Sequence, residues 1–377
     1  MSLSLQEILL VLSTMAAATM LVGTLFNLFT APRLEKAPPP RTSLRVSLLI
    51  PARNEEANLR ILMPLLSRLD FPGLEILILD DDSNDGTAVV AAYPGSPARL
   101  IRGQPLPLGW LGKNWACAQL ASQAQGEVLI FCDADVRVGP GAIPSTLGMM
   151  QAQNLDALTC IPYQILGTWA EKAIIPVLLF MPALGYIPID WIRRIPIPFL
   201  SVGCGQWFAF TREAYDCLGG HASVRNEIVE DMMLGRRVKA SGMVLGAAIA
   251  TRHLSVRMYT DFRSVWQGFG KNMAFLTGTG WLKPPAVLAF SVTCNVLPWL
   301  MPLLGFRLWV LPLSIWIACR LLCASIFKEP LLAWLWSPLG TLLVPLIAIR
   351  SWWGYRRGSV QWKGRNLTAA FTKPSEG

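Results

Sequence analysis

Residues 46–87 read VSLLIPARNEEANLRILMPLLSRLDFPGLEILILDDDSNDGT, and this stretch decides the fold. The apolar runs at residues 46–51 and 74–79 are short and bounded by turn residues, so they predict two strands. Residues 54–58 open a helix that we expect to run to about Leu69. A strand, a crossover helix and a second strand form a right-handed parallel unit, which predicts the start of an α/β domain.

The same alternation continues toward the middle of the chain. We expect a further helix from residues 85–87 and another over residues 113–125, with strands over residues 128–132 and 157–162. Helices that alternate with strands predict a three-layer α/β arrangement. We expect this domain to cover residues 44–260.

Acidic side chains follow the predicted strands in a fixed order, with one lysine among them. The residues are Asp80, Asp81, Asp82, Lys113, Asp133, Asp135, Glu230 and Asp231. Asp133 and Asp135 stand on either side of Ala134, where the strand at residues 128–132 leaves the sheet. The carboxyl ends of strands in an open α/β sheet line the crevice in which ligands usually bind. These side chains are therefore expected to form one site.

The residue types indicate what this site could bind. Hard carboxylate oxygens suit Mg²⁺ or Mn²⁺, with substrate phosphates completing the coordination shell. Zinc is not expected, because the chain has only two histidines and no CxxC pair. A departing diphosphate needs a cation and a lysine, and an acceptor hydroxyl needs a carboxylate base. The set therefore fits a nucleotide-diphospho-sugar as the donor.

Five short motifs resemble those of the family 2 glycosyltransferases with a GT-A fold. They are residues 51–56 (PARNEE), 80–87 (DDDSNDGT), 112–116 (GKNWA), 133–135 (DAD) and 229–231 (VED). The resemblance covers about residues 45–270. More narrowly, residues 110–116 and residues 219–227 look like the membrane-bound branch that acts on carotenoids and hopanoids.

The resemblance also implies roles for the matching residues. It makes Asp231 the general base, with Glu230 beside it, and it places the metal at Asp135 and Asp133. Asp80 and Asp81 match the pair that binds the nucleotide base and ribose. The full set of implied donor-binding residues is Pro51, Arg53, Glu55, Asp80, Asp81, Lys113 and Asp133.

The chain departs from the family pattern in two places. Asp82 stands where a glycine is usual, which adds a third carboxylate. The Gln-x-x-Arg-Trp motif of processive synthases is absent, and residues 263–268 (RSVWQG) are the nearest stretch, so processive polymer synthesis is not expected. Residues 362–365 (WKGR) resemble the Trp-x-Gly-Arg ending of lipid glucosyltransferases, and such a tail must be cytoplasmic if it folds back on the donor.

The composition is too apolar for an ordinary soluble enzyme. Of 377 residues, 53% are hydrophobic, and the mean hydropathy is +0.43. Residues 8–29 carry no charge and four cations follow them, so we expect an anchor at residues 1–31 and a cytoplasmic α/β domain. A cleaved signal peptide is the alternative, but Glu7 and the lack of a basic n-region argue against it. The expected location is the plasma membrane or an equivalent membrane.

Residues 284–350 are almost continuously apolar, as expected for membrane helices. They lie between a connector at residues 261–283 and a basic tail at residues 351–377. Three full crossings would put the tail outside, although its charge favours the inside. Arg320 makes the middle of three apolar segments the weakest candidate for a full span. We expect two crossings and one re-entrant or interfacial helix, with Arg320 snorkelling, paired with another helix or contacting a lipid phosphate.

A separate apolar stretch lies inside the α/β domain. Residues 173–189 carry no charge and contain three prolines, each of which removes a backbone donor that lipid cannot replace. We interpret residues 173–190 as an interfacial segment on which the domain rests, with a buried core helix as the alternative.

Three further motifs have two interpretations each. His221 is either a turn histidine bonded to backbone or a contact to the acceptor or a phosphate. Residues 203–207 (GCGQW) form either an acceptor-side loop, with Trp207 stacking on a sugar or polyene, or a tight turn with a core tryptophan. Glu230 and Asp231 also suit a helix N-terminus, and both interpretations can hold together.

The resulting prediction is an inverting glycosyltransferase that moves one hexose to a hydroxyl of a carotenoid, a hopanoid or another isoprenoid alcohol, with a UDP-sugar as the expected donor. One alternative is transfer to a polyprenyl phosphate or a polysaccharide. Another is a non-catalytic membrane subunit that binds nucleotide-sugar or lipid. The net charge of +9 favours anionic lipid headgroups over nucleic acid as a partner, because the cations cluster beside apolar segments. The oligomeric state stays open.

Overall fold

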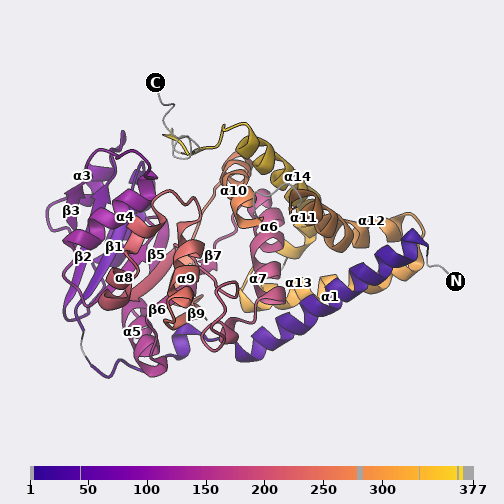
Figure 1. The fold of residues 1–377 in the computed structure, drawn as a ribbon, viewed down its shortest axis with the longest axis horizontal. Coiled ribbons are helices and arrows are strands. Elements are labelled where there is room, and N and C mark those ends of the chain that lie inside the picture. Colours follow the sequence, from indigo (N-terminus) through magenta and orange to yellow (C-terminus); the bar gives the residue numbers. More distant parts are fainter. Residues whose placement is uncertain (1–3, 43, 278–282, 331, 363–364, 368–377) are drawn as a thin grey trace. The chain divides into compact units, whose positions relative to one another are not determined.

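The computed structural model describes residues 4–42, 44–277, 283–330, 332–362 and 365–367. The chain forms two compact units (Figure 1). The α/β unit comprises Pro32–Gln164, Asp190–Met258 and Lys363–Gly377, and the helical unit comprises Met1–Ala31, Ile165–Ile189 and Tyr259–Trp362. Part of the predicted connector, residues 278–282, and part of the predicted tail, residues 363–364 and 368–377, lie outside the described residues.

The α/β unit is built on a seven-stranded sheet in the order β3-β2-β1-β4-β8-β6-β9. β8 runs antiparallel to β4 and β6, and the other neighbours in this sheet are parallel. A second sheet has the order β5-β10-β7. The strands are β1 Val46–Ala52, β2 Leu74–Asp80, β3 Arg99–Arg102, β4 Val128–Cys132, β5 Val136–Val138, β6 Ala157–Ile161, β7 Tyr163–Gln164, β8 Trp207–Thr211, β9 Leu245–Ile249 and β10 Leu254–Val256.

Helices connect these strands, which confirms the α/β class expected from the sequence. The helices of this unit are α2 Glu56–Leu66, α3 Thr87–Ala91, α4 Gly112–Gln123, α5 Ala142–Gln153, α8 Arg212–Cys217 and α9 Glu230–Ala240, with short 3₁₀ turns at η1 Leu34–Lys36 and η4 Gly220–Val224. The first predicted helix ends at Leu66 rather than Leu69, because the N–H groups of Arg68 and Leu69 bond to carbonyls only three residues back, at Leu65 and Leu66.

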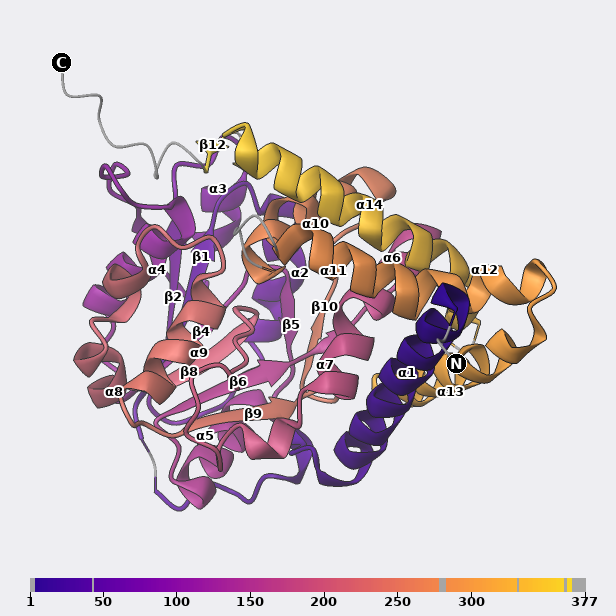
Figure 2. The same cartoon turned by 45° about the vertical axis from the view of Figure 1, so that its right-hand side comes forward.

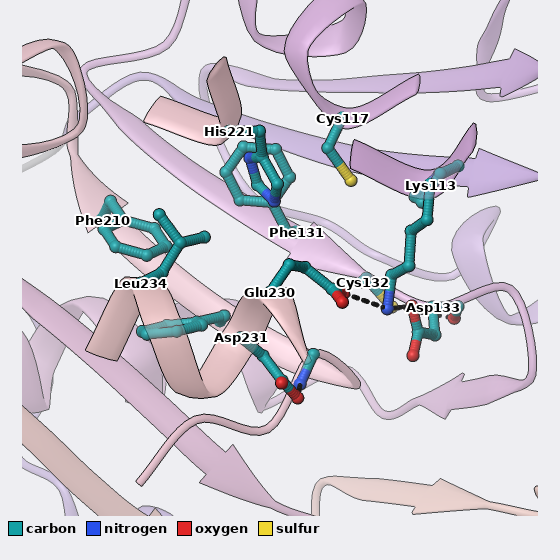
Figure 3. Close-up of a pocket in the computed structure, with 13 residues that line it drawn as sticks. Lys113, Cys117, Phe131, Cys132, Asp133, Phe210, His221, Glu230, Asp231 and Leu234 are labelled. Atoms are coloured by element: carbon teal, nitrogen blue, oxygen red, sulfur yellow. Dashed lines mark hydrogen bonds and ion pairs between the residues drawn. The ribbon is translucent and has the colours of Figure 1, made fainter. Parts of the chain in front are cut away.

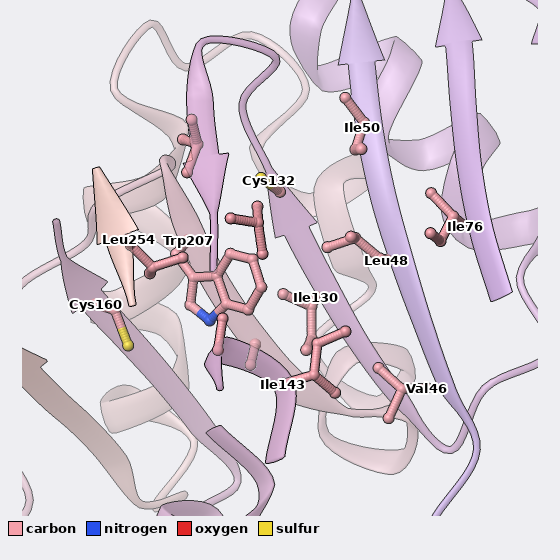
Figure 4. Close-up of a cluster of buried hydrophobic side chains, with 14 of the residues drawn as sticks. Val46, Leu48, Ile50, Ile76, Ile130, Cys132, Ile143, Cys160, Trp207 and Leu254 are labelled. Carbon is pink, nitrogen blue, oxygen red and sulfur yellow. The ribbon is translucent and has the colours of Figure 1, made fainter. Parts of the chain in front are cut away.

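The core of this unit lies on the central strands (Figure 4). Leu48 of β1 and Ile130 of β4 are fully buried, as expected for strands covered by helices. Trp207 is also fully buried, and its indole N–H donates to Thr146 Oγ1 at 3.0 Å. Trp207 is therefore a core tryptophan and does not stack on a sugar or polyene.

The helical unit contains, among the described residues, four helices long and apolar enough to cross a membrane: Leu5–Thr30, Lys283–Leu303, Arg307–Ile326 and Ala333–Arg356. The protein is therefore membrane-associated. The elements of this unit are α1 Leu5–Thr30, α6 Trp169–Ile175, η2 Pro176–Phe180, α7 Met181–Tyr186, α10 Phe262–Thr277, α11 Lys283–Ser291, η5 Val292–Val296, α12 Leu297–Leu303, η6 Arg307–Trp309, α13 Val310–Ile326, η7 Ala333–Trp336 and α14 Ser337–Arg356. The 3₁₀ turn η3 Ile189–Trp191 joins the two units, and two short strands near the C-terminus are β11 Gln361–Trp362 and β12 Arg365–Asn366.

The first helix is packed into the helical unit. α1 and α13 lie side by side (Figures 1 and 2), and the Cys319 thiol of α13 is 4.0 Å from the carbonyl oxygen of Ala17. Near the other end of α1, the buried Asn27 side chain donates to the carbonyls of Leu184 and Ile187, both at 2.7 Å. These contacts join α1 to segments that follow it far along the chain.

Residues 173–189 lie inside the helical unit as α6, the π-helical turn η2 and α7. Ala173 is fully buried, and a Cβ on Gly340 of α14 would lie 1.9 Å from the Ala173 carbonyl oxygen. The structure thus supports the alternative of a buried core helix over an interfacial segment. Pro176 and Pro182 stand inside this continuous helical run, and the π-helical turn that begins at Pro176 is the local irregularity that accompanies them.

Arg320 is paired inside the helical unit. Its guanidinium donates to Glu329 Oε1 at 3.1 Å and to Ser337 Oγ at 3.1 Å, and only 1% of its side chain is exposed. The expectations of snorkelling and of a lipid-phosphate contact were therefore wrong, because Glu329 folds back to neutralise the charge. With this charge neutralised, the segment Arg307–Ile326 is no longer the weakest candidate for a span.

The last long helix packs along α6 and α10. The Arg350 guanidinium donates to the Trp266 carbonyl at 2.8 Å, and Ser351 Oγ accepts the Ala274 N–H at 2.9 Å. The C-terminal half of α14 is therefore held by α10, the first long helix after β10.

Candidate active site

The predicted catalytic residues meet at the carboxyl end of β4 (Figure 3). Lys113, in the first turn of α4, points at two carboxylates: its Nζ lies 2.7 Å from Asp133 Oδ1 and 2.9 Å from Glu230 Oε1. Asp133 follows β4, and Glu230 begins α9. One lysine therefore joins the end of a strand to the start of a helix that is distant in the sequence.

Charge and burial shift the pKa values in this cluster. Burial alone would lower the pKa of Lys113, but Asp133 and Glu230 raise it well above its ordinary value. Burial alone would raise the pKa of Glu230, yet Lys113 lowers it overall. Burial raises the pKa of Asp133 in spite of Lys113. Lys113 therefore stays charged and can stabilise negative charge that develops on a ligand.

Asp231 faces the same pocket from α9 (Figure 3). Its Oδ2 accepts a hydrogen bond from the Gly205 N–H at 2.8 Å, and its Oδ1 accepts one from the Met232 N–H at 2.7 Å. Burial raises the pKa of Asp231 to about 6, and the neighbouring Glu230 carboxylate adds to the shift. An oriented carboxylate with a pKa close to neutrality has the properties of a general base.

The loop before β8 needs glycine at two positions to approach α9. A Cβ on Gly203 would lie 2.1 Å from the carbonyl oxygen of Asp231, and a Cβ on Gly205 would lie 2.9 Å from Lys113 Nζ. Only a residue without a side chain lets the backbone come this close. The interpretation of residues 203–205 as a loop at the site is thus supported, whereas Trp207 belongs to the core.

Asp133 and Asp135 are the candidates for a divalent cation. Both lie in the turn between β4 and β5, and both are half-buried. Within the described parts of the chain, no group of three His, Cys, Asp or Glu side chains is arranged to hold a metal ion by itself. Mg²⁺ sites at phosphate substrates use one or two carboxylates and complete the shell with phosphate oxygens and water. The two aspartates therefore fit a cation that arrives with a phosphate ligand.

Asp80 and Asp81 form a second cluster at the end of β2. Both are buried, and Asp80 Oδ2 lies 2.7 Å from Arg102 Nη1. Asp81 Oδ2 lies 2.5 Å from Arg365 Nη1, while Arg53 donates to the Asp81 carbonyl oxygen at 2.5 Å. Burial raises the pKa of Asp81, and Arg365 opposes this shift. These carboxylates therefore lie among arginines, and Asp81 lies beside Gly112 at the start of α4.

Arg365 was not among the predicted site residues. It belongs to β12 and reaches Asp81 from 284 positions away in the chain. A Cβ on Gly112, next to Lys113, would lie 2.2 Å from Arg365 Nη1, so this arginine fills the space beside the start of α4. The resemblance at residues 362–365 was the available signal, but it named no partner.

Asp82 does not enter the site. Its φ is +56°, and its side chain is 84% exposed. The left-handed conformation explains why glycine suits this position, and aspartate is one of the residues that tolerate it. The third carboxylate therefore largely faces solvent, although it lies 3.7 Å from Arg53 Nη1 and adds to the raised pKa of Asp81.

Pro51 and Glu55 lie at the end of β1. Pro51 lines the pocket with Lys113. The Glu55 N–H donates to Thr87 Oγ1 at 2.8 Å, and its carboxylate accepts a hydrogen bond from Asn58 at 2.6 Å. Glu55 therefore holds the loop after β1 against α3.

His221 and Asn114 make hydrogen bonds within the protein that support the elements around the pocket. His221 Nδ1 is 2.8 Å from the Tyr215 hydroxyl, and burial lowers the pKa of His221 to about 3, so the ring is neutral. This arrangement fits a structural histidine, although its partner is a side chain rather than backbone. Asn114 was not predicted, and its amide donates to the carbonyls of Val224 at 2.7 Å and Glu227 at 3.0 Å, which positions the segment before α9.

Comparisons with known proteins agree with this arrangement. A model of glycosyl transferase family 2 matches residues 47–219. The 4,4'-diaponeurosporenoate glycosyltransferase of Staphylococcus aureus strain MRSA252 is 26% identical over 341 residues, which cover 86% of this chain and 88% of that protein. The protein of the same name from Staphylococcus haemolyticus is 27% identical over 236 residues, which cover 62% of each chain.

Among solved structures, the chain is similar to the mannosyltransferase PcManGT from Pyrobaculum calidifontis in complex with GDP-Man and Mn²⁺. The TM-score is 0.50 at 17% sequence identity, and the match covers 92% of this chain and 98% of that one. At this identity the likeness concerns the fold alone. It confirms the GT-A fold that the sequence motifs predicted.

Proposed function

We propose that the chain is an inverting enzyme of the glycosyl transferase family 2 type, whose model matches residues 47–219, and that it moves one hexose from a nucleotide-diphospho-sugar to a lipophilic acceptor. One observation carries the proposal: Asp231 lines the same pocket as Lys113 and the carboxylates that hold it. A group that can remove a proton and a group that can stabilise a leaving diphosphate are thus held together. A single direct displacement between them inverts the anomeric centre.

Asp231 acts on the acceptor. The hydrogen bond from the Gly205 N–H fixes the direction of its carboxylate. The carboxylate removes the proton of the acceptor hydroxyl as the hydroxyl oxygen forms its bond to the anomeric carbon. Because the pKa of Asp231 is about 6, the carboxylate is mostly ionised at neutral pH and ready to accept that proton.

Lys113 acts on the leaving group. As the bond between the anomeric carbon and the diphosphate breaks, negative charge develops on the diphosphate, and the ammonium group stabilises it. Asp133 and Glu230 hold the ammonium group in position on both sides. A divalent cation at Asp133 and Asp135, Mg²⁺ or Mn²⁺, supplies further charge neutralisation when it is bound.

The cluster at the end of β2 binds the nucleotide in this proposal. Asp80 and Asp81 present buried carboxylates that suit the hydrogen-bond donors of a base and a ribose. Arg53 and Arg365 contribute positive charge beside them. A UDP-sugar is the donor we propose.

A carotenoid or a related isoprenoid is the acceptor we propose, because the relatives are named for 4,4'-diaponeurosporenoate. That name denotes a carboxylate, which favours a second candidate for the acceptor group. A carboxylate carries no proton at neutral pH and needs no base. The two candidates therefore differ in whether transfer depends on Asp231.

The α/β unit is proposed to lie in the cytoplasm. The cations Arg33, Lys36, Arg41 and Arg45 follow α1, and such residues concentrate on the inner side of membranes. We propose that α1, Lys283–Leu303 and Arg307–Ile326 cross the membrane and that α14, which packs along α10, does not. This assignment keeps the expected two crossings after the α/β unit, which makes three in total with α1, and keeps Arg365 on the side of Asp81.

The proposal is tested by measuring the transfer of radiolabelled sugar from UDP- and GDP-sugars into a total lipid extract. The assay uses purified protein with Mn²⁺ or Mg²⁺ and compares the wild type with the variant Asp231→Asn. Asp70→Asn is the matched control, because it alters an exposed carboxylate of the same size in the loop between α2 and β2. A labelled lipid that is formed by the control and not by Asp231→Asn supports a hydroxyl acceptor. A labelled lipid that persists in Asp231→Asn and is released by mild alkali supports the carboxylate acceptor. An absence of any labelled lipid, with donor binding intact, contradicts the proposal.

A further inference from the structure

The segment between the helical unit and β8 exposes large apolar side chains. Trp191 is 45% exposed, Ile197 54% and Phe199 86%, whereas Ile192 is buried and anchors the segment. Its backbone hydrogen bonds are local turns, such as the Leu200 N–H to the Ile197 carbonyl at 3.0 Å. Residues 191–199, here called the 191–199 loop, therefore present an apolar edge on a segment that is ordered mainly by itself.

The start of this loop is tied to the end of the first membrane helix. Ile189 donates its N–H to Asn27 Oδ1 at 2.9 Å, and Asn27 lies in the last turn of α1. The chain leaves α1 for the cationic residues Arg33 and Lys36, so in the proposed topology this end of α1 lies at the boundary of the bilayer. The loop thus begins two residues after a residue held at that boundary.

The far end of the loop is tied to the candidate base. The Lys239 ammonium group of α9 donates to the Leu200 carbonyl oxygen. Gly203 follows and packs against the backbone of Asp231, and the Gly205 N–H binds the Asp231 carboxylate. One continuous segment therefore leads from the membrane boundary to the group that is proposed to take the acceptor proton.

The charges of the loop suit a lipid headgroup layer. Arg193 and Arg194 both contact Asp190, at 3.2 Å and 2.7 Å, which leaves one net positive charge. Residues 191–206 contain no other charged side chain. Aromatic side chains beside arginine are typical of the layer between lipid tails and water, and a positive charge favours anionic lipids. If the loop bound a protein partner instead of lipid, its position next to the end of α1 would have no explanation.

We propose that the 191–199 loop inserts Trp191, Ile197 and Phe199 into the interfacial layer of an anionic bilayer and passes a bilayer-resident acceptor to Asp231. The delivery of the acceptor rests on the proposed function, whereas the contact with the bilayer does not. The experiments below separate the two.

The bilayer contact is tested with a fluorescent probe at position 199. Phe199→Cys is labelled with a nitrobenzoxadiazole maleimide in a Cys217→Ser background, because Cys217 is the exposed cysteine among the described residues. Burial raises the pKa of the half-buried Cys204 to about 12, so it does not compete for the label. Val89→Cys, at a 77% exposed position of α3, is the matched control.

The labelled proteins are placed in phosphatidylglycerol nanodiscs that contain lipids with a nitroxide near the headgroup. Emission from position 199 should fall by about half or more, and emission from position 89 should not change. Equal emission changes at the two positions would overturn the proposal. A blue shift at position 199 that appears without lipid and grows with protein concentration would also overturn it, because it would assign the loop to a contact between copies of the chain.

Acceptor delivery is tested with the double variant Ile197→Ser/Phe199→Ser beside Val89→Ser. We expect the KM for an acceptor embedded in vesicles to rise about tenfold in the double variant, with the KM for the donor unchanged. An unchanged acceptor KM would refute delivery. If the proposed function fails and no transfer occurs, the probe experiment still decides whether the loop contacts the bilayer.

Discussion

Replacing Asp231 with asparagine should abolish most transfer to a hydroxyl acceptor and leave donor binding intact. The carboxylate accepts hydrogen bonds from the N–H groups of Gly205 and Met232, one at each oxygen. Asparagine has only one amide oxygen, so it keeps one of these bonds, at a cost of about 1 kcal/mol in local stability. The shape of the site is otherwise preserved, and the change removes chiefly the ability to take a proton.

The expected loss is about 10³-fold in kcat, or about 4 kcal/mol in the activation free energy. General base catalysis by a positioned side chain contributes roughly 10²- to 10⁴-fold, and each tenfold change equals about 1.4 kcal/mol. The KM for the donor should not change, because the nucleotide cluster at Asp80 and Asp81 is separate from Asp231.

The pH profile gives a sharper test of the same reasoning. Asp231 must be ionised to act as a base and its pKa is about 6, so the rate should fall about tenfold per pH unit below that value. The Glu230 carboxylate helps to raise this pKa. Glu230→Gln should therefore move the acidic limb to lower pH, although it also removes one partner of Lys113.

The assay is the initial rate of labelled lipid formation at saturating donor, from about pH 5 to about pH 9. Asp70→Asn is the control and should follow the wild-type profile, because its side chain is exposed in the loop between α2 and β2. An Asp231→Asn variant that retains more than about a tenth of the wild-type rate on a hydroxyl acceptor would refute the assignment of the base. So would an acidic limb that stays in place in Glu230→Gln.

Substitutions at three other sites test separate parts of the structure. Lys113→Met should lower kcat by about 10²-fold, measured as transfer rate at saturating donor, because the diphosphate loses a fixed cation; an equal rate would remove Lys113 from the mechanism. Glu329→Gln leaves the Arg320 charge buried without its partner and should lower the free energy of unfolding by about 3 kcal/mol, measured as a lower Tm in detergent. The double variant Arg320→Met/Glu329→Leu should restore most of that stability. Gly203→Ala should reduce transfer more than donor binding, because its Cβ would meet the Asp231 backbone at 2.1 Å; full activity would show that the loop can move aside.

Local patterns accounted for part of the α/β unit. The apolar runs at residues 46–51, 74–79 and 128–132 became β1, β2 and β4, because the alternation of strands and helices depends mainly on near neighbours in the chain. Strands β3, β8 and β9 of the large sheet and β5, β7 and β10 of the second sheet were not predicted. β3 is short and partly exposed, and β9 (LGAAI) consists of small residues, so neither carries a strong apolar pattern.

The membrane part shows where composition misleads. Residues 173–189 are uncharged and rich in proline, and both facts suited an interfacial segment. Their burial depends on α14, which begins about 150 positions later. The charge on Arg320 likewise suggested contact with lipid, but Glu329 neutralises it within the protein.

By itself, the sequence determined which residues carry the chemistry: carboxylates at the ends of strands, one lysine between them and an acidic pair at the start of a helix. These signals are local, because each depends on a few adjacent residues and on the period of one strand or helix. Only the tertiary structure decided that Lys113 lies between Asp133 and Glu230, that Gly205 orients Asp231, that Arg365 reaches Asp81 and that Asp82 faces solvent. These contacts join residues far apart in the chain or depend on one backbone angle, and such contacts form when buried apolar surfaces pack the elements together.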